Sequence, residues 1–136
     1  MTRDELLRDP YVAAFPELVP FWEAAARSVL LLPRCTVCGA THWHPRAQCP
    51  FCRSDAMRWE QASGRGTLHT FTVIRRPHGA PDLLAYVRLE EGPLMLTSIV
   101  GEEQPERLRI GDAVQVTFRV VPEGRWAPVF RCQAIK

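Results

Sequence analysis

The sequence predicts a mainly β protein in three parts: an N-terminal helical segment (residues 1–29), a small cysteine-rich module (30–61) and a five-stranded barrel (62–136). Three observations predict this organisation. Helical periodicity is confined to the start of the chain, four cysteines follow in two close pairs, and the remainder alternates apolar and polar residues between turn sequences. With 136 residues, 46% hydrophobic and 24% charged, the chain has the composition of one small globular protein.

The N-terminal part contains two helical patterns. A short one over residues 4–8 is expected to stop at Asp9-Pro10. A stronger one runs from Glu17 to Ser28, where Pro20 suits a first helical turn and apolar residues recur at helical spacing. Four apolar residues near its start either contact a partner protein or only cap the barrel. These candidate interface residues are Phe15, Leu18, Phe21 and Trp22.

The four cysteines of the second part are spaced as C-x2-C, ten residues, C-x2-C: Cys35, Cys38, Cys49 and Cys52. Two close pairs can bring four thiolates to one point, as a tetrahedral metal site requires. Because four thiolates fill the coordination shell, the spacing predicts a structural site with no open position for a substrate. Zinc is the expected metal. The knuckles also resemble those of rubredoxin, so iron is an alternative in an expressed sample.

Residues around the cysteines suit this interpretation. Gly39 permits a positive φ at the end of the first knuckle, and Pro50 fixes φ in the second. The module has few apolar residues, so the metal is expected to contribute on the order of 10 kcal/mol to its folding. Trp43 and Trp59 are expected to cover it. The fifth cysteine, Cys132, stands alone in an apolar stretch and is expected to be a buried, inert thiol.

The third part reads as five strands, expected near residues 67–75, 83–90, 94–100, 114–120 and 128–135. Five short strands joined by tight turns suggest a small closed barrel, and five is the strand number of an OB-fold. Arg75 and Arg76 end the first of these strands. They are either a solvated strand end or a contact to a phosphorylated ligand or an acidic partner surface, since the guanidinium fork matches both.

Several classes of protein are disfavoured by what the sequence lacks. It has no nucleophile motif, no spaced carboxylate pair and no phosphate-binding glycine loop, so an autonomous enzyme is not expected. No segment approaches the ~20 apolar residues that cross a bilayer, and no signal-peptide pattern is present, so we expect a cytoplasmic protein.

Nucleic-acid binding is the main alternative function. Barrels of this kind bind single strands by stacking bases on aromatic side chains, for which Phe71, Tyr86 and Phe118 are available. A formal net charge of only +2 and scattered arginines count against this alternative.

An ordered set of motifs between residues 17 and 133 resembles the DUF35 family. The set includes Leu32-Pro33-Arg34-Cys35-x-x-Cys38-Gly39, Pro45-Arg46-x-x-Cys49-Pro50-x-Cys52, Ser63-Gly64-x-Gly66, Ile110-Gly111-Asp112-x-Val114 and Pro128-Val129-Phe130. The resemblance implies a rubredoxin-like zinc ribbon joined to an OB-fold. It also implies a non-catalytic companion of thiolase-like enzymes, such as sterol-carrier-protein-type thiolases and related aldolases, or of hotdog-fold enoyl-CoA hydratases.

In that family the companion completes an acyl-CoA site or holds partners together, in some cases during the degradation of steroid side chains. The resemblance therefore implies a CoA thioester bound through the complex, with the catalytic residues on the partner. The sequence does not indicate which residues touch CoA.

Overall fold

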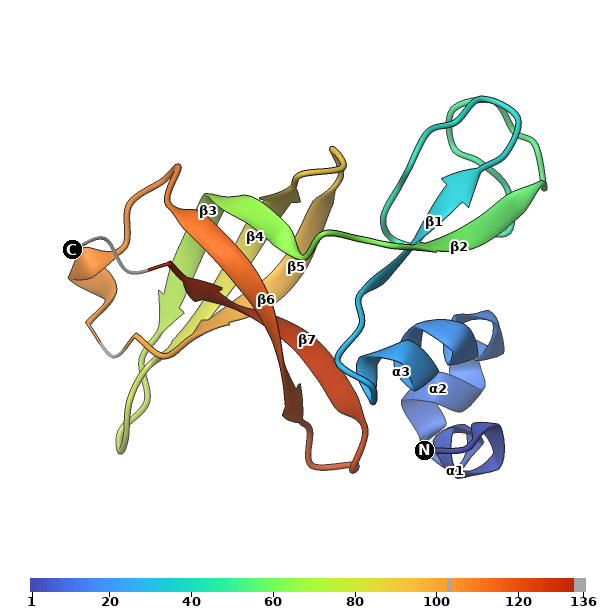
Figure 1. Cartoon of the computed structure of the whole chain (residues 1–136). Coiled ribbons are helices and arrows are strands. Elements are labelled where there is room, and N and C mark those ends of the chain that lie inside the picture. The colour runs from blue at the N-terminus through green and yellow to red at the C-terminus, as the bar shows by residue number, and fades with distance from the viewer. Residues whose placement is uncertain (103, 134–136) are drawn as a thin grey trace. The chain divides into compact units, whose positions relative to one another are not determined.

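The computed structural model describes residues 1–102 and 104–133. The chain forms two compact units. One contains residues 1–62 together with 118–128, and the other contains residues 63–117 together with 129–133. Figure 1 shows the helices, the two-stranded sheet and the barrel.

The chain begins with three short α-helices and one 3-10 turn: α1 (Arg3–Leu7), α2 (Pro10–Ala14), η1 (Pro16–Leu18) and α3 (Val19–Ala25). A capping box starts α1, in which the Glu5 amide donates to Thr2 Oγ1 (3.1 Å) and the Thr2 amide donates to Glu5 Oε1 (3.2 Å). None of the helices in the described part of the chain combines the length and the apolar character that crossing a membrane requires.

Two boundaries in this segment differ from the sequence-based expectation. Asp9-Pro10 starts a helix as well as ending one. Asp9 Oδ1 accepts a hydrogen bond from the Tyr11 amide (2.9 Å), and the first position of α2 suits Pro10 because its backbone N–H, which proline lacks, has no partner within a helix. The predicted helix to Ser28 ends at Ala25. Ser28 lies in the left-handed region (φ 62°), and the Val29 amide donates back to Ala24 O (2.9 Å), which closes a Schellman cap.

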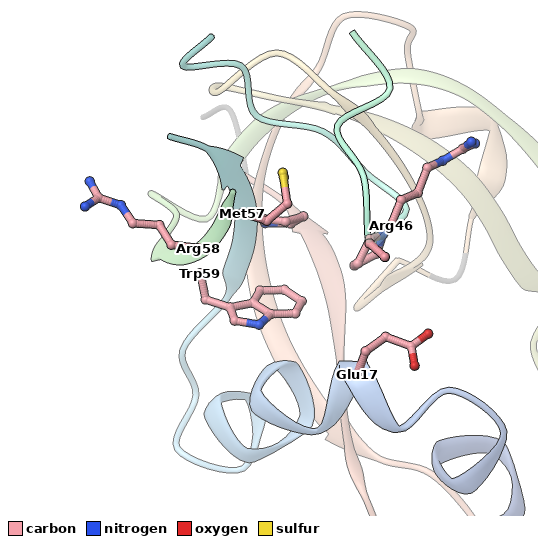
Figure 2. A pocket seen from close by; sticks show the side chains of 8 residues that line it. Glu17, Arg46, Met57, Arg58 and Trp59 are labelled. Carbon is pink, nitrogen blue, oxygen red and sulfur yellow. The ribbon is translucent and has the colours of Figure 1, made fainter. Parts of the chain in front are cut away.

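The cysteine module is built on a two-stranded antiparallel sheet of β1 (Leu31–Cys35) and β2 (Met57–Gln61). Pro33 faces Trp59 in the register of this pair. The Phe21 ring of α3 lies 4.8 Å from the Trp43 ring and 6.3 Å from the Trp59 ring, measured between centroids. The two tryptophans therefore cover the module from the helix side, as expected. A cavity of about 160 Å³ lies beside Trp59 (Figure 2).

The predicted five-stranded barrel is confirmed. Its strands are β3 (Arg65–Ile74), β4 (Asp82–Leu89), β5 (Leu94–Val100), β6 (Ala113–Val120) and β7 (Trp126–Cys132), and they close in the order β3-β4-β5-β7-β6. A short 3-10 helix, η2 (Pro105–Arg107), lies between β5 and β6. The long β3 pairs with both β4 and β6, and β5 pairs in parallel with β7.

Alternation along the strands explains the interior of the barrel. On β4, every second residue from Leu83 to Leu89 is buried. A bulge between Leu68 and Thr70 bends β3, which pairs with β4 on both sides of it. The same strand approaches β4 so closely at Gly66 that a Cβ there would lie 2.5 Å from the Arg88 carbonyl oxygen, which is why this position requires glycine.

The end of the barrel sequence differs from expectation in two ways. The predicted apolar face of β6 is buried only at Val114, while Val120 is 54% exposed. Residues 118–128, which include the end of β6, belong to the first compact unit. The last strand begins at Trp126 and ends at Cys132; residues 134 and 135 of the predicted strand lie outside the described residues. Cys132 is half-buried rather than fully buried, and burial raises the pKa of its thiol.

Candidate metal centre

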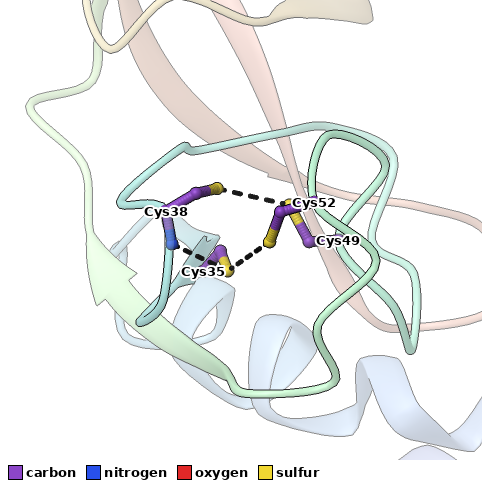
Figure 3. A group of neighbouring side chains, drawn as sticks. All are labelled: Cys35, Cys38, Cys49 and Cys52. Atoms are coloured by element: carbon purple, nitrogen blue, oxygen red, sulfur yellow. Dashed lines mark hydrogen bonds between the residues drawn. The ribbon is translucent and has the colours of Figure 1, made fainter.

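The four predicted cysteines come together at one point. Their Sγ atoms all lie within 4.8 Å of one another, with Cys35 Sγ 3.5 Å from Cys52 Sγ and Cys38 Sγ 3.6 Å from Cys49 Sγ (Figure 3). Four thiolates bound tetrahedrally at about 2.3 Å from a zinc ion stand about 3.8 Å from each other. The separations in the sulfur cluster are within about 1 Å of those that a four-coordinate metal requires.

The two knuckles have the same backbone construction. In the first, the Cys35 amide donates to Ala40 O (2.9 Å) and the Gly39 amide to Cys35 O (2.9 Å). In the second, the Cys49 amide donates to Ser54 O (2.7 Å) and the Arg53 amide to Cys49 O (2.9 Å). Each knuckle thus presents its two sulfurs from a closed turn, one pair from each side of the site.

A left-handed residue follows the second cysteine of each knuckle. Gly39 has a φ of 78°, as the sequence predicted, and Arg53 occupies the equivalent position with a φ of 67°. A side chain makes this conformation unfavourable, so Arg53 is strained where Gly39 is not. The strain at Arg53 was not predicted, because arginine rarely marks a left-handed turn.

Backbone amides point at the sulfurs and favour their charged form. The Cys38 amide lies 3.5 Å from Cys35 Sγ and is the main reason that the pKa of Cys35 falls to about 6, against the opposing effect of burial. For the Cys49 thiol, burial is the largest single influence and raises the pKa. Hydrogen bonds, including those from the Cys52 and Phe51 amides, outweigh burial, so the pKa of Cys49 is lowered.

Cys52 behaves in the opposite way. The Ser54 amide lowers the pKa of Cys52, but burial and hydrogen bonds with the three other thiols together raise it to about 11. A raised pKa favours the protonated form of the Cys52 thiol at neutral pH. A divalent cation displaces such protons when it binds, because thiolate is the form that ligates metals.

Arg34 braces the site against the sheet. Its Nε donates to Gly39 O (3.0 Å), and its guanidinium lies 3.3 Å from the Glu60 carboxylate, which also accepts from Arg58 Nε (2.8 Å). On the other side of the knuckle, Thr36 Oγ1 donates to Ala56 O (2.8 Å). The first knuckle is therefore fixed to β2 through side chains as well as through strand pairing.

The candidate ligand set consists of four sulfurs. Among the described residues, these cysteines form the one group of three or more potential ligand side chains with such spacing, and neither His42 nor His44 belongs to it. Cys35 and Cys49 are buried, whereas Cys38 and Cys52 are exposed. Such a site closes the coordination shell and suits a structural role.

None of the other predicted site residues belongs to the cysteine cluster. Arg75 is exposed just beyond β3, and Arg76 pairs with Asp82 (Nε to Oδ2, 3.0 Å). Leu18, Phe21 and Trp22 are buried in the chain's own fold, whereas Phe15 is 45% exposed. Of the four candidate interface residues, only Phe15 presents a large apolar surface outward.

One cluster had no counterpart in the sequence interpretation. Arg125, in the turn before β7, forms an ion pair with Asp9 and lies over two aromatic rings, 4.8 Å from the centre of Tyr11 and 4.7 Å from that of Trp22. All of these residues belong to the first compact unit.

Two family models match the chain in succession. Residues 22–58 match the model described as the rubredoxin-like zinc ribbon domain of ChsH2. Residues 59–119 match the model described as the C-terminal OB-fold domain of ChsH2. These are the two kinds of domain that the sequence resemblance implied.

Three similar proteins are informative. A DUF35 domain-containing scaffold protein of Methanothermobacter thermautotrophicus is 36% identical over 96 residues, which cover 66% of this chain and 71% of that protein. A probable enoyl-CoA hydratase alpha subunit of Thermomonospora curvata is 33% identical over 116 residues, covering 82% of this chain but 36% of that longer protein. A solved structure described as the Ltp2-ChsH2(DUF35) aldolase superimposes with a TM-score of 0.73 at 32% identity, over 85% of this chain and 93% of that one.

Proposed function

The chain belongs to the DUF35 family, and from this premise we propose that it is a non-catalytic accessory subunit of a thiolase-like acyl-CoA enzyme. In this proposal the partner is a sterol-carrier-protein-type thiolase or a related aldolase and carries the catalytic residues. The present chain stabilises the partner and completes its acyl-CoA site. The substrate is a CoA thioester, with a steroid or lipid side chain as the acyl class.

The observation that carries the proposal is the likeness to the DUF35 chain of the Ltp2-ChsH2(DUF35) aldolase. That likeness covers 93% of the other chain at 32% identity, so it extends over both the ribbon and the barrel. Relatives described as scaffold proteins support the same role.

The chemistry of the metal centre also supports a non-catalytic role. Zinc bound by Cys35, Cys38, Cys49 and Cys52 has no free coordination position for a water or a carbonyl oxygen. The metal therefore contributes folding free energy, because a site assembled from two knuckles does not exist in the unfolded chain. Iron would be held by the same four sulfurs.

Arg75 is the candidate contact to the CoA thioester or to an acidic surface of the partner. Its guanidinium forms no hydrogen bond or ion pair with any of residues 1–102 and 104–133, whereas Arg76 is occupied by Asp82. A free guanidinium can bind a phosphate in bidentate fashion. A raised KM for the CoA thioester in an Arg75→Ala complex, with unchanged complex formation, is the expected result; an unchanged KM would remove Arg75 from this role.

A second candidate partner is an enoyl-CoA hydratase of the hotdog fold. The similarity to the Thermomonospora curvata hydratase alpha subunit favours this partner. Most of this chain (82%) matches a segment that makes up 36% of that longer protein. Both candidates are acyl-CoA enzymes, and both assign the chain the same accessory role.

Co-purification from the native cell tests the proposal. The tagged chain is expected to elute on size exclusion with a thiolase-like protein or a hydratase, identified by its mass, in a defined ratio. A chain that elutes alone at micromolar concentration, beside a partner that is soluble and fully active without it, would contradict the proposal.

A further inference from the structure

We propose that the outer edge of β2 and the cavity beside Trp59 together bind an extended segment of the partner protein. The segment adds a strand to β2 and places one apolar side chain in the cavity. This inference rests on the proposed function and specifies how the partner is held. All the residues involved lie within residues 1–62, in one compact unit.

The first observation is that, in the part of the chain that the structure describes, β2 pairs with another strand on one side only. The Cys35 amide donates to Ala40 O, and Pro33 O accepts from the His42 amide, so these groups of β1 point away from β2. In an antiparallel pair, two residues that face each other either both point their backbone N–H and C=O groups toward the other strand or both point them away from it. Trp59, which faces Pro33, therefore directs its N–H and C=O away from β1.

No acceptor for the Trp59 amide is found among residues 1–102 and 104–133, and the same holds for Gln61. A strand edge with free donors and acceptors is a template for another strand. Many proteins recognise extended peptides in this way, with backbone hydrogen bonds for affinity and a side-chain pocket for specificity.

The second observation is the cavity itself (Figure 2). Three successive residues of β2, from Met57 to Trp59, line it together with Pro33 and the loop residues 45–47. Its volume of about 160 Å³ is close to that of an apolar cavity of about 150 Å³ that holds benzene in another protein. One aromatic or branched aliphatic side chain therefore fills it.

The third observation concerns the charges at its mouth. Arg46 and Glu17 both line the cavity, and in Figure 2 their charged ends point away from the Trp59 ring. Neither side chain forms an ion pair or a hydrogen bond in the described part of the chain, whereas Arg58 is paired with Glu60. The complementary segment carries its apolar residue between an acidic residue beside Arg46 and a basic residue beside Glu17.

The test uses the purified partner identified by co-purification and two tryptophan variants of one loop. Ala47→Trp fills the mouth of the cavity from an exposed position, and Gln48→Trp adds the same bulk one residue away from it. Isothermal titration is expected to show a Kd for the partner that rises at least about tenfold for Ala47→Trp, as for loss of a central anchor. The Kd of Gln48→Trp is expected to stay unchanged. Zinc content serves as the folding control.

Hydrogen exchange followed by NMR gives a second readout that does not depend on a variant. The Trp59 and Gln61 amides are expected to exchange rapidly in the free chain and to become protected in the complex. Normal binding by Ala47→Trp, with Trp59 still unprotected in the complex, would overturn the inference and leave the proposed function standing. The absence of any complex would overturn both, and protection of Trp59 in the chain alone at high concentration would assign the edge to self-association instead.

Discussion

Asp9 and Arg125 form an ion pair although they lie 116 positions apart in the sequence. Both side chains are largely buried, with 6% and 12% of their surface exposed. Asp9 uses its other oxygen to cap α2 through the Tyr11 amide. The guanidinium also lies over the rings of Tyr11 and Trp22. One carboxylate therefore both starts a helix and fixes the turn before β7 to it.

This pair predicts strong, non-additive effects on stability. Asp9→Asn keeps a capping side chain but leaves the guanidinium with the more distant and more exposed carboxylate of Glu123 (3.7 Å), and Arg125→Met leaves the Asp9 carboxylate without its ion-pair partner. Each is expected to lower the free energy of unfolding by about 3 kcal/mol, since an uncompensated buried charge is costly. The double variant is expected to lose clearly less than the sum, as measured by urea unfolding of the metal-loaded protein. Additive losses would show that the two residues do not act as a pair.

Removal of one metal ligand is expected to unfold the ribbon rather than abolish a chemical step. Cys38→Ser should lose the metal, the ordered structure of residues 30–61 and partner binding together, because the metal contributes much of the folding free energy there. Metal analysis by mass spectrometry and NMR dispersion of the ribbon resonances measure this. Cys132→Ser, outside the cluster, is the control. A Cys38→Ser complex that forms normally but does not turn over would contradict the structural interpretation.

The equivalent positions Gly39 and Arg53 are expected to respond in opposite directions to substitution. Gly39→Ala should weaken zinc binding, because a Cβ on a left-handed residue costs about 1–2 kcal/mol. A steric clash adds nothing to this cost, since the nearest atom to the new Cβ would belong to Arg34, 3.8 Å away. Arg53→Gly should strengthen it slightly, since relief of strain exceeds the entropy cost of glycine, about 0.5–1 kcal/mol. Competition with a chelator measures both. Weaker binding by Arg53→Gly would show that its side chain has a role beyond the turn.

Binding to single-stranded nucleic acid is expected to be absent at micromolar concentration in physiological salt. Several arginines of the chain are neutralised by carboxylates, including Arg65 by Glu90 and Arg76 by Asp82. The exposed ring of Tyr86 stands beside Leu96, its neighbour across β4 and β5, which is also exposed, so the direct neighbour of this ring is apolar. A gel shift with DNA and RNA at several salt concentrations measures this. Micromolar binding with a steep salt dependence would favour the nucleic-acid alternative.

Local patterns explain why much of the fold was predictable. The cysteine spacing defines the metal centre because its ligands are close in sequence, and the strands of the barrel carry clear alternation, as on β4. Helix boundaries were less accurate where caps decide them. Asp9 and Ser28 act through their backbone geometry and hydrogen bonds, which apolar periodicity does not reveal.

Features that depend on distant residues were not predictable. No local pattern marks Arg125 as the partner of Asp9 or Arg53 as a left-handed residue. The candidate interface residues are a second example, because their contacts within the chain were not predictable either. The helical pattern included Phe21 and Trp22 as apolar residues. It did not indicate that Trp43 would pack against the Phe21 ring or that Arg125 would lie over the Trp22 ring.

The central claim is that this chain supports catalysis by another subunit without carrying it out. Its most direct test is the steady-state cleavage rate of a CoA thioester by the purified thiolase-like partner, measured with increasing amounts of the zinc-loaded chain. We expect no turnover by the chain alone and a partner rate that rises and saturates at a fixed stoichiometry. A partner that is equally active at every concentration of the chain, or a chain that turns over the thioester by itself, would contradict it.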